Sequence, residues 1–351
     1  MKNLWRALPF SFILLFLAGC GKQNLSALDP RGPVAEMQYS LIILSLLIMI
    51  FVIVVVAAIY IYVLVRFREK PGDNHIPKQV EGNKNLEIIW TAIPIVLLLI
   101  LAIPNVMDTF TLAETEPDED SLVIEVTGHQ FWWEFEYTDL GITAGQDLYI
   151  PTDTRIIFDL EASDVIHSFW IPALAGKQDN VPGITNSLWI EAPEEGVYQG
   201  KCTELCGESH WLMDFKVIAV DPDTFEAWAQ GMAEPSEELI EPADEVAAEG
   251  REVYEANCLA CHAVGGEGGN PQGGPDLTNF AEREVIAGFI EWDADTEYDG
   301  EEVSALEGWL REPQEYKPGN YMPAFGHEAI DEDEMASLLE YLDTLRVLDD
   351  E

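Results

Sequence analysis

Basic residues and cysteines are scarce in this sequence of 351 residues. It holds 18 Lys and Arg against 64 Asp and Glu, which gives a formal charge of −46. Such a chain repels the phosphate backbone, so the composition disfavours a nucleic-acid role. Its five cysteines are too few for a disulfide scaffold, and their spacing indicates separate local sites. Because 48% of the residues are hydrophobic, the chain is not a disordered polyanion either.

The acidic residues are concentrated downstream of about Ala113. Two readings compete: a surface adapted to high salt, or an acidic docking face for a basic partner. The charge is spread so widely along the chain that it favours adaptation to salt. The length leaves room for two modest domains beyond any membrane part.

The first twenty residues, MKNLWRALPFSFILLFLAGC, have a basic start, a short apolar run and small residues before Cys20. This pattern predicts a secretory signal over residues 1–19. The ending Leu17-Ala18-Gly19-Cys20 resembles a bacterial lipobox, which implies cleavage before Cys20 and attachment of lipid to its sulfur. An uncleaved signal anchor, or a cysteine with no role, is the alternative.

Two long apolar runs follow, Leu41 to Val65 and Ile88 to Met107. Each is long enough to cross the roughly 30 Å hydrocarbon core of a membrane. Between them lies a dense group of basic residues: Arg66, Arg68, Lys70, Lys78 and Lys84. The positive-inside rule places that loop in the cytoplasm. We therefore predict a membrane anchor over 20–110, with helices at about 40–65 and 88–108, and an exported region beyond it.

The first exported domain, 121–222, reads as short strands rich in Val, Ile, Phe, Trp and Tyr. Such a pattern is typical of a β-sandwich or a small barrel. A loop between two of these strands carries four potential metal ligands, and a fifth is expected at the end of an earlier strand. They are Cys202, Cys206, His210 and Met213 on the loop, and His167 on the strand.

An exported Cys-x3-Cys pair taken alone would most simply form a disulfide. Zinc is another option, although methionine is a poor zinc ligand. Thiolates, imidazoles and a thioether together are the soft set that selects copper. The remote His167, combined with Cys-x3-Cys-x3-His-x2-Met on one loop, therefore favours a copper site.

The stretches HSFWIPALAGKQDNVPG and YQGKCTELCGESHWLM resemble the cupredoxin-like, binuclear copper (CuA) domain of cytochrome c oxidase subunit II. The two-span hairpin, WTAIP and GHQFWWEFEY fit the same family, so the resemblance covers about Leu41 to Glu226. It implies that both cysteine sulfurs bridge two copper ions and that His167 and His210 each bind one. Met213 and the backbone carbonyl of Glu204 would complete the site.

The resemblance implies three further roles. The Glu204 side chain would bind magnesium or manganese at the interface with subunit I, and Glu87 would lie at the mouth of a proton channel. Trp132 and Trp133 are candidate electron relays, with core packing as the alternative. Here the sequence departs from the family, because Phe131 stands where the aromatic run usually begins with Trp.

A short helix and an acidic linker, 223–245, precede a second exported domain, 246–351. Cys258-Leu-Ala-Cys261-His262 is a c-type haem attachment motif, in which both thiols bond the haem and the histidine binds its iron. The domain resembles a small all-α class I cytochrome c. Met322, in KPGNYMPAFG, is then the sixth ligand, with His327 as its rival, and the Pro275 carbonyl would hold the His262 ring.

These resemblances imply subunit II of a proton-translocating cytochrome c oxidase with a cytochrome c domain fused to its C-terminus. It would accept electrons at haem c and pass them through CuA to subunit I, where oxygen is reduced to water and protons are pumped. The alternative is the electron-accepting subunit of a copper-containing nitric oxide reductase. Expected partners are subunits I and III and an external donor, either a cytochrome or a cytochrome c reductase complex. The expected location is the bacterial plasma membrane, multi-pass, with both domains on the periplasmic face.

Overall fold

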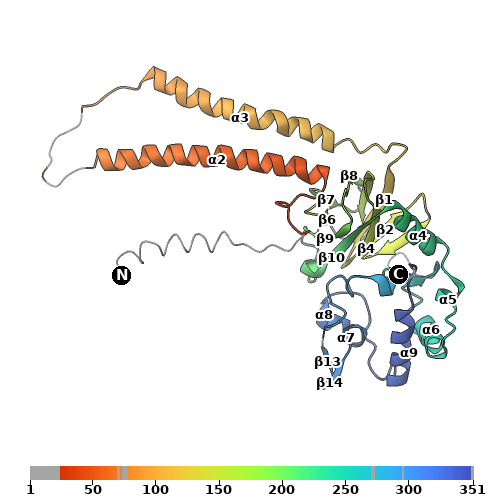
Figure 1. The fold of residues 1–351 in the computed structure, drawn as a ribbon. Helices are drawn as coiled ribbons and strands as arrows, with labels where there is room; N and C mark the ends of the chain where they lie inside the picture. Colours follow the sequence, from red (N-terminus) through yellow and green to blue (C-terminus); the bar gives the residue numbers. More distant parts are fainter. Residues whose placement is uncertain (1–23, 69–71, 73–77, 270–272, 295, 349–351) are drawn as a thin grey trace, which may run out of the picture. The chain divides into compact units, whose positions relative to one another are not determined.

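The computed structural model describes residues 24–68, 72, 78–269, 273–294 and 296–348 (Figure 1). The predicted signal segment and the lipidation site at Cys20 therefore lie outside the described residues. The chain divides into two compact units, Glu36–Glu114 and a second unit that comprises Thr115–Glu351 and the segment before Glu36.

Two long helices, α2 (Pro33–Arg66) and α3 (Lys84–Leu112), make up the first unit. Apart from Val34 and Ala35 at the start of α2, their apolar side chains are not buried, and both helices are long and apolar enough to cross a membrane. A helix that is hydrophobic all round and not covered by protein is typical of a membrane span. Asn83 begins α3 by accepting bonds from the amides of Asn85 and Leu86. Both helices extend several residues beyond the apolar runs that predicted them.

A sandwich of two five-stranded sheets, here called the β domain, opens the second unit. One sheet has the order β3-β2-β1-β5-β8 and the other β4-β10-β9-β6-β7. Their bounds are β1 Leu122–His129, β2 Trp132–Tyr137, β3 Ile142–Gly145, β4 Asp147–Pro151, β5 Ile156–Ala162, β6 His167–Trp170, β7 Lys177–Asn180, β8 Asn186–Ile190, β9 Gly196–Cys202 and β10 Asp214–Val220. The β1/β5 and β4/β10 pairs are parallel, and the other pairs are antiparallel.

Aromatic side chains fill the space between the two sheets. Phe169 stacks on Phe215 with ring centroids 4.6 Å apart, and Trp133 packs edge-on against Phe169 at 5.4 Å. Helix α4 (Pro222–Ala233) returns to this core, because its fully buried Trp228 stacks on Tyr149 at 4.7 Å. The helix after the last strand is therefore part of the β domain.

The remaining chain forms a helical domain. Its helices are α5 Glu237–Ile240, α6 Glu245–Asn257, α7 Ala305–Arg311, α8 Pro313–Tyr316 and α9 Glu332–Asp343, with two short hairpins, β11 Ala263–Val264 with β12 Glu267–Gly268 and β13 Thr296–Tyr298 with β14 Glu301–Val303. Helices α6 and α9 approach closely because Gly250 has no side chain. A Cβ placed there would lie 2.9 Å from the Cβ of Tyr341 and closer still to the Ser337 backbone.

The structure confirms the predicted class: two apolar helices, a cupredoxin-like sandwich and a helical domain. It corrects one placement, since His167 begins strand β6 rather than ending a strand. The residues before it, Ser163–Ile166, form a bend in which the Asp164 carboxylate accepts from the Val165 amide, and this bend delays the strand.

Candidate metal centres

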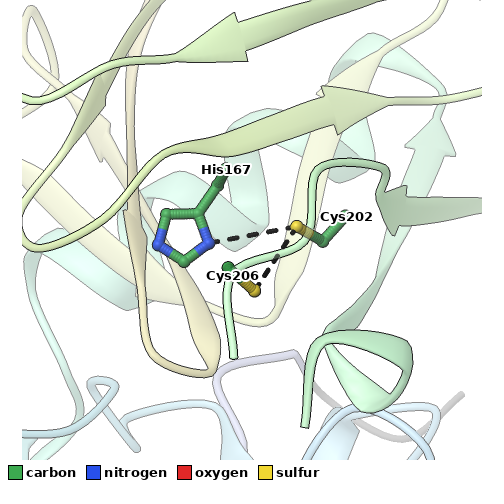
Figure 2. A group of neighbouring side chains, drawn as sticks. All are labelled: His167, Cys202 and Cys206. Atoms are coloured by element: carbon green, nitrogen blue, oxygen red, sulfur yellow. Dashed lines mark hydrogen bonds between the residues drawn. The ribbon is translucent and has the colours of Figure 1, made fainter. Parts of the chain in front are cut away.

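Strands β6 and β9 bring together the residues predicted to bind copper. Phe169 of β6 pairs with Cys202, the last residue of β9, so that His167 lies beside the loop that follows Cys202. His167, Cys202 and Cys206 are all buried, and their donor atoms lie within 4.8 Å of one another (Figure 2).

The donor distances describe one compact cluster around two sulfurs. The Cys202 Sγ lies 3.8 Å from the Cys206 Sγ and 3.9 Å from His167 Nδ1, as the dashed lines in Figure 2 show. The Cys206 Sγ lies 3.7 Å from His210 Nδ1 and 3.8 Å from Met213 Sδ. The carbonyl oxygen of Glu204 lies 3.3 Å from the Cys202 Sγ. The four other predicted donors therefore converge on the sulfur pair.

Hydrogen bonds and burial shift the pKa values of the donor residues in this cluster. The hydrogen bond that the two sulfurs share lowers the pKa of Cys202 and raises the pKa of Cys206. Burial lowers the pKa of His167, but hydrogen bonds with Asp164 and Cys202 outweigh it and leave this pKa above its ordinary value. The Nε2 atom of His167 lies 2.8 Å from Asp164 Oδ1, which leaves Nδ1 facing the sulfurs. A carboxylate in this position fixes the ring and raises its basicity as a ligand.

Backbone bonds fix the ligand loop at both ends. The Cys202 amide donates to the Met213 carbonyl at 3.1 Å, and the Thr203 amide donates to the Ser168 carbonyl at 3.0 Å. Gly128 of β1 leaves room for the His167 ring, because a Cβ there would lie 2.8 Å from a ring carbon. The loop is thus held in one geometry by its frame.

The predicted haem motif follows helix α6 directly. The amides of Cys261 and His262 both donate to the Cys258 carbonyl, at 3.0 and 2.9 Å, which places all three side chains on one tight turn. His262 Nδ1 lies 2.8 Å from the Pro275 carbonyl oxygen, so Nε2 is left free to bind a metal. Burial lowers the pKa of His262, which favours the neutral ring that a metal needs.

A largely apolar pocket surrounds this turn, and Met322 is among the residues that line it together with Cys258, Cys261 and His262. His327 does not line it and instead pairs with Glu332, with Nδ1 2.7 Å from the carboxylate. Gly274 leaves room for the His262 ring, since a Cβ there would lie 2.8 Å from Nδ1. Soft sulfur and imidazole donors in one apolar pocket fit a haem with His and Met ligands. The cluster in the β domain equally fits copper.

The side chains of Glu87 and Glu204 make no contact with the donors among the described interactions, whereas Trp132 and Trp133 lie close to the two sites. Glu87 is in the first turn of α3, and the exposed Glu204 side chain accepts a bond from the Leu205 amide. Trp132 lines the pocket of the helical domain and stacks on His129 at 4.2 Å. Trp133 is buried, lies edge-on to the His167 ring at 5.9 Å and donates from Nε1 to the Met213 carbonyl at 3.4 Å.

Sequence reasoning missed three residues that contact the copper-type cluster. Asp164 holds His167, Gln130 donates from Nε2 to the Cys206 carbonyl at 2.5 Å, and Ser209 links the loop to the helical domain. A carboxylate three residues before a histidine was the only available signal for Asp164. In a chain with 64 acidic residues, that signal carries little information.

Two membrane-type helices, a sandwich with a soft-ligand cluster and a helical domain with a haem attachment motif define a membrane-anchored electron-transfer protein. Family models agree with this class. The model for the cytochrome c oxidase subunit II transmembrane domain matches residues 23–107, the one for its periplasmic domain matches 141–220, and the one for cytochrome c matches 247–346.

Curated relatives match this chain over two thirds or more of its length. A cytochrome c oxidase subunit 2 from Alkalihalophilus pseudofirmus is 51% identical over 99% of both chains. A protein of the same name from Bacillus sp. PS3 is 46% identical over 98% of both chains. A quinol oxidase subunit 2 from Bacillus cereus is 35% identical but matches 68% of this chain and 84% of its own. This chain belongs to the cytochrome c oxidase subunit 2 family.

Proposed function

We propose that this chain is the electron-accepting subunit II of a respiratory cytochrome c oxidase. The observation that carries the proposal is the convergence of four further donors on the Cys202–Cys206 sulfur pair, in the same compact unit as a haem attachment motif. Electrons pass from an external donor to the helical domain, from there to the β domain, and then to subunit I. Oxygen is reduced to water in that subunit, and protons are pumped across the membrane.

Haem c and binuclear copper, when bound, supply one-electron sites whose ligands stay in place in both redox states. In the helical domain, Cys258 and Cys261 would attach the haem, and His262 and Met322 would bind its iron. The Pro275 carbonyl accepts a hydrogen bond from the His262 ring and fixes its orientation. In the β domain, Cys202 and Cys206 would hold the copper ions together with His167, His210, Met213 and the carbonyl of Glu204.

The surrounding assignments form part of the same proposal. Subunits I and III share the membrane with α2 and α3, and the donor is a cytochrome or a cytochrome c reductase complex. The Glu204 side chain binds magnesium or manganese at the subunit I interface, and Glu87 lies at the mouth of a proton channel. Trp132 and Trp133 relay electrons. Cys20 carries lipid, and the location is the plasma membrane with both domains on its outer face.

The relatives support cytochrome c oxidase rather than quinol oxidase. The relatives with the former name match nearly the whole chain, including the region of the haem attachment motif. The quinol oxidase relative matches 68% of it. A copper-containing nitric oxide reductase could use the same two domains. The complex isolated with its partner subunits should therefore be assayed for consumption of oxygen and of nitric oxide. Oxygen consumption without nitric oxide consumption is the expected result.

Metal analysis with electron paramagnetic resonance on the full chain tests the site itself. We expect two coppers per haem, with one unpaired electron shared equally between the copper nuclei. Cys206→Ser should abolish this sharing because it removes one bridge. Met213→Leu is the matched control at a weak ligand, and it should keep both coppers and shift only their potential. Shared spin that persists in the serine variant would refute the bridging role.

A further inference from the structure

The two loops predicted to carry metal ligands, one in each exported domain, touch each other. Ser209 stands between Cys206 and His210, and its Oγ donates to the Pro318 carbonyl at 2.6 Å. Pro318 lies four residues before Met322 in the helical domain. One hydrogen bond therefore joins the loop that holds Cys206 and His210 to the loop that holds Met322.

The Ser209 hydroxyl is not needed inside its own loop. Ser209 immediately precedes the short 3₁₀ helix His210–Leu212, where a serine commonly caps the first amides with its hydroxyl. Here the side chain makes no capping bond, although it is fully buried. Its hydroxyl is directed across the domain interface instead, which indicates a role between the domains.

The loop that holds Pro318 and Met322 transmits this contact to Met322, because hydrogen bonds within the loop fix its backbone. Asn320 donates from Nδ2 to the Lys317 carbonyl at 2.6 Å and accepts from the Met322 amide at 2.7 Å. The Gly319 amide donates to Gln314 Oε1 at 3.0 Å. Fixing the Pro318 carbonyl therefore fixes the backbone of Met322 as well.

An aromatic ring fills the space beside this bond. Phe131 is 4% exposed and lies against both loops. A Cβ at Gly207 would lie 2.8 Å from its Cζ, and a Cβ at Gly319 would lie 3.6 Å from its Cε2. Both glycines have positive φ, +143° and +77°, which a side chain would also disfavour. Phe131 thus occupies the place between the two loops.

We propose that Ser209 is a positioning residue that holds the Met322 loop against the copper-ligand loop, with Phe131 packed between them. This inference rests on the proposed function for its meaning in electron transfer. The bond would keep the two ligand sets in one arrangement while an electron passes from the helical domain to the β domain. No covalent bond changes in that step, and no proton moves.

Hydrogen exchange on the full chain, without any metal, tests whether the Ser209 hydrogen bond holds the two domains together. The Glu284 amide of the helical domain donates to Asp147 Oδ2 of the β domain at 3.1 Å, so its exchange reports separation of the domains. In Ser209→Ala this amide should exchange about fivefold faster, which equals about 1 kcal/mol at 1.4 kcal/mol per factor of ten, as expected for one lost hydrogen bond. Ser209→Thr restores a hydroxyl and should return the rate toward that of the wild type.

Ser187→Ala is the matched control, since it removes a hydroxyl bond to Asp159 within the β domain and should leave Glu284 unchanged. In the loaded chain, Ser209→Ala should slow electron transfer from haem to copper and leave the copper resonance signal unaltered. Unchanged Glu284 exchange in Ser209→Ala would overturn the proposal. So would an altered copper signal with unchanged exchange, because Ser209 would then act only within its own loop. Absence of bound metal would refute the proposed function and leave the exchange test valid.

Discussion

Acid should destabilise this protein through one buried histidine. His129 is 5% exposed, stacks on Trp132, and shares a 2.8 Å hydrogen bond between Nδ1 and the Ser163 hydroxyl. Burial lowers its pKa from 6.5 to about 4. The folded state therefore disfavours the protonated ring, and protonation favours the unfolded state. The free energy of unfolding keeps its full value above pH 6.5 and decreases as the pH falls toward 4. At 1.36 kcal/mol per pH unit, the full loss is about 3 kcal/mol, and the loss at pH 5 is about 2 kcal/mol.

The variant His129→Asn removes the charge and keeps a polar group near Ser163. Urea unfolding of the full chain in detergent, with a chelator present, should be followed by tryptophan fluorescence at pH 7.5 and pH 5. Between pH 7.5 and pH 5, the free energy of unfolding of the wild type should fall by about 2 kcal/mol more than that of the variant. His327→Asn, at a half-exposed histidine, is the control. A wild-type-minus-variant difference that stays constant with pH would refute the reasoning.

Three further outcomes follow from packing and charge. Gly274→Ala should displace the His262 ring, because the new methyl group would lie 2.8 Å from Nδ1. The absorption spectrum of the haem-loaded protein should then lose its His/Met signature, and an unchanged spectrum would contradict this close contact. Gly250→Ala should force α6 away from α9 and lower the free energy of unfolding by about 1–3 kcal/mol, as at other overpacked sites, so the urea midpoint should fall. An unchanged midpoint would show that the helices can separate without cost. Added salt should stabilise the exported region, because screening weakens the repulsion within a chain of charge −46; a midpoint that is equal in dilute buffer and in 1 M NaCl would favour the docking-face interpretation of the acidity.

Local patterns made much of this fold predictable. The apolar runs predicted α2 and α3, and the Cys258–His262 motif lies on one turn, so its spacing alone describes its geometry. Long-range placement could not be derived in this way. His167 reaches Cys202 only because β6 pairs with β9, and both β6 and its polar partner β7, Lys177–Asn180, are too short to give a clear strand pattern.

The contacts of Ser209 and Trp228 were beyond sequence reasoning for the same reason. Ser209 bonds a carbonyl 109 residues away, and no local property of either segment indicates that contact. The sequence predicted a helix near Trp228 but not that its indole would enter the β domain core. Strand pairing and contacts between distant segments depend on the whole chain, whereas helix and strand propensity and motif spacing depend only on residues near in the sequence.

The burial of Trp228 has a kinetic consequence. Because α4 is fixed in the β domain and α5 belongs to the helical domain, the connection between the domains shortens to the segment between Ala233 and Glu237. Fully extended, that segment reaches on the order of 15 Å. A helical domain that separates therefore stays within a small volume, where its effective concentration is in the millimolar range. Return to the β domain is then a first-order process, so this internal step should keep the same rate however far the membrane or its soluble carriers are diluted.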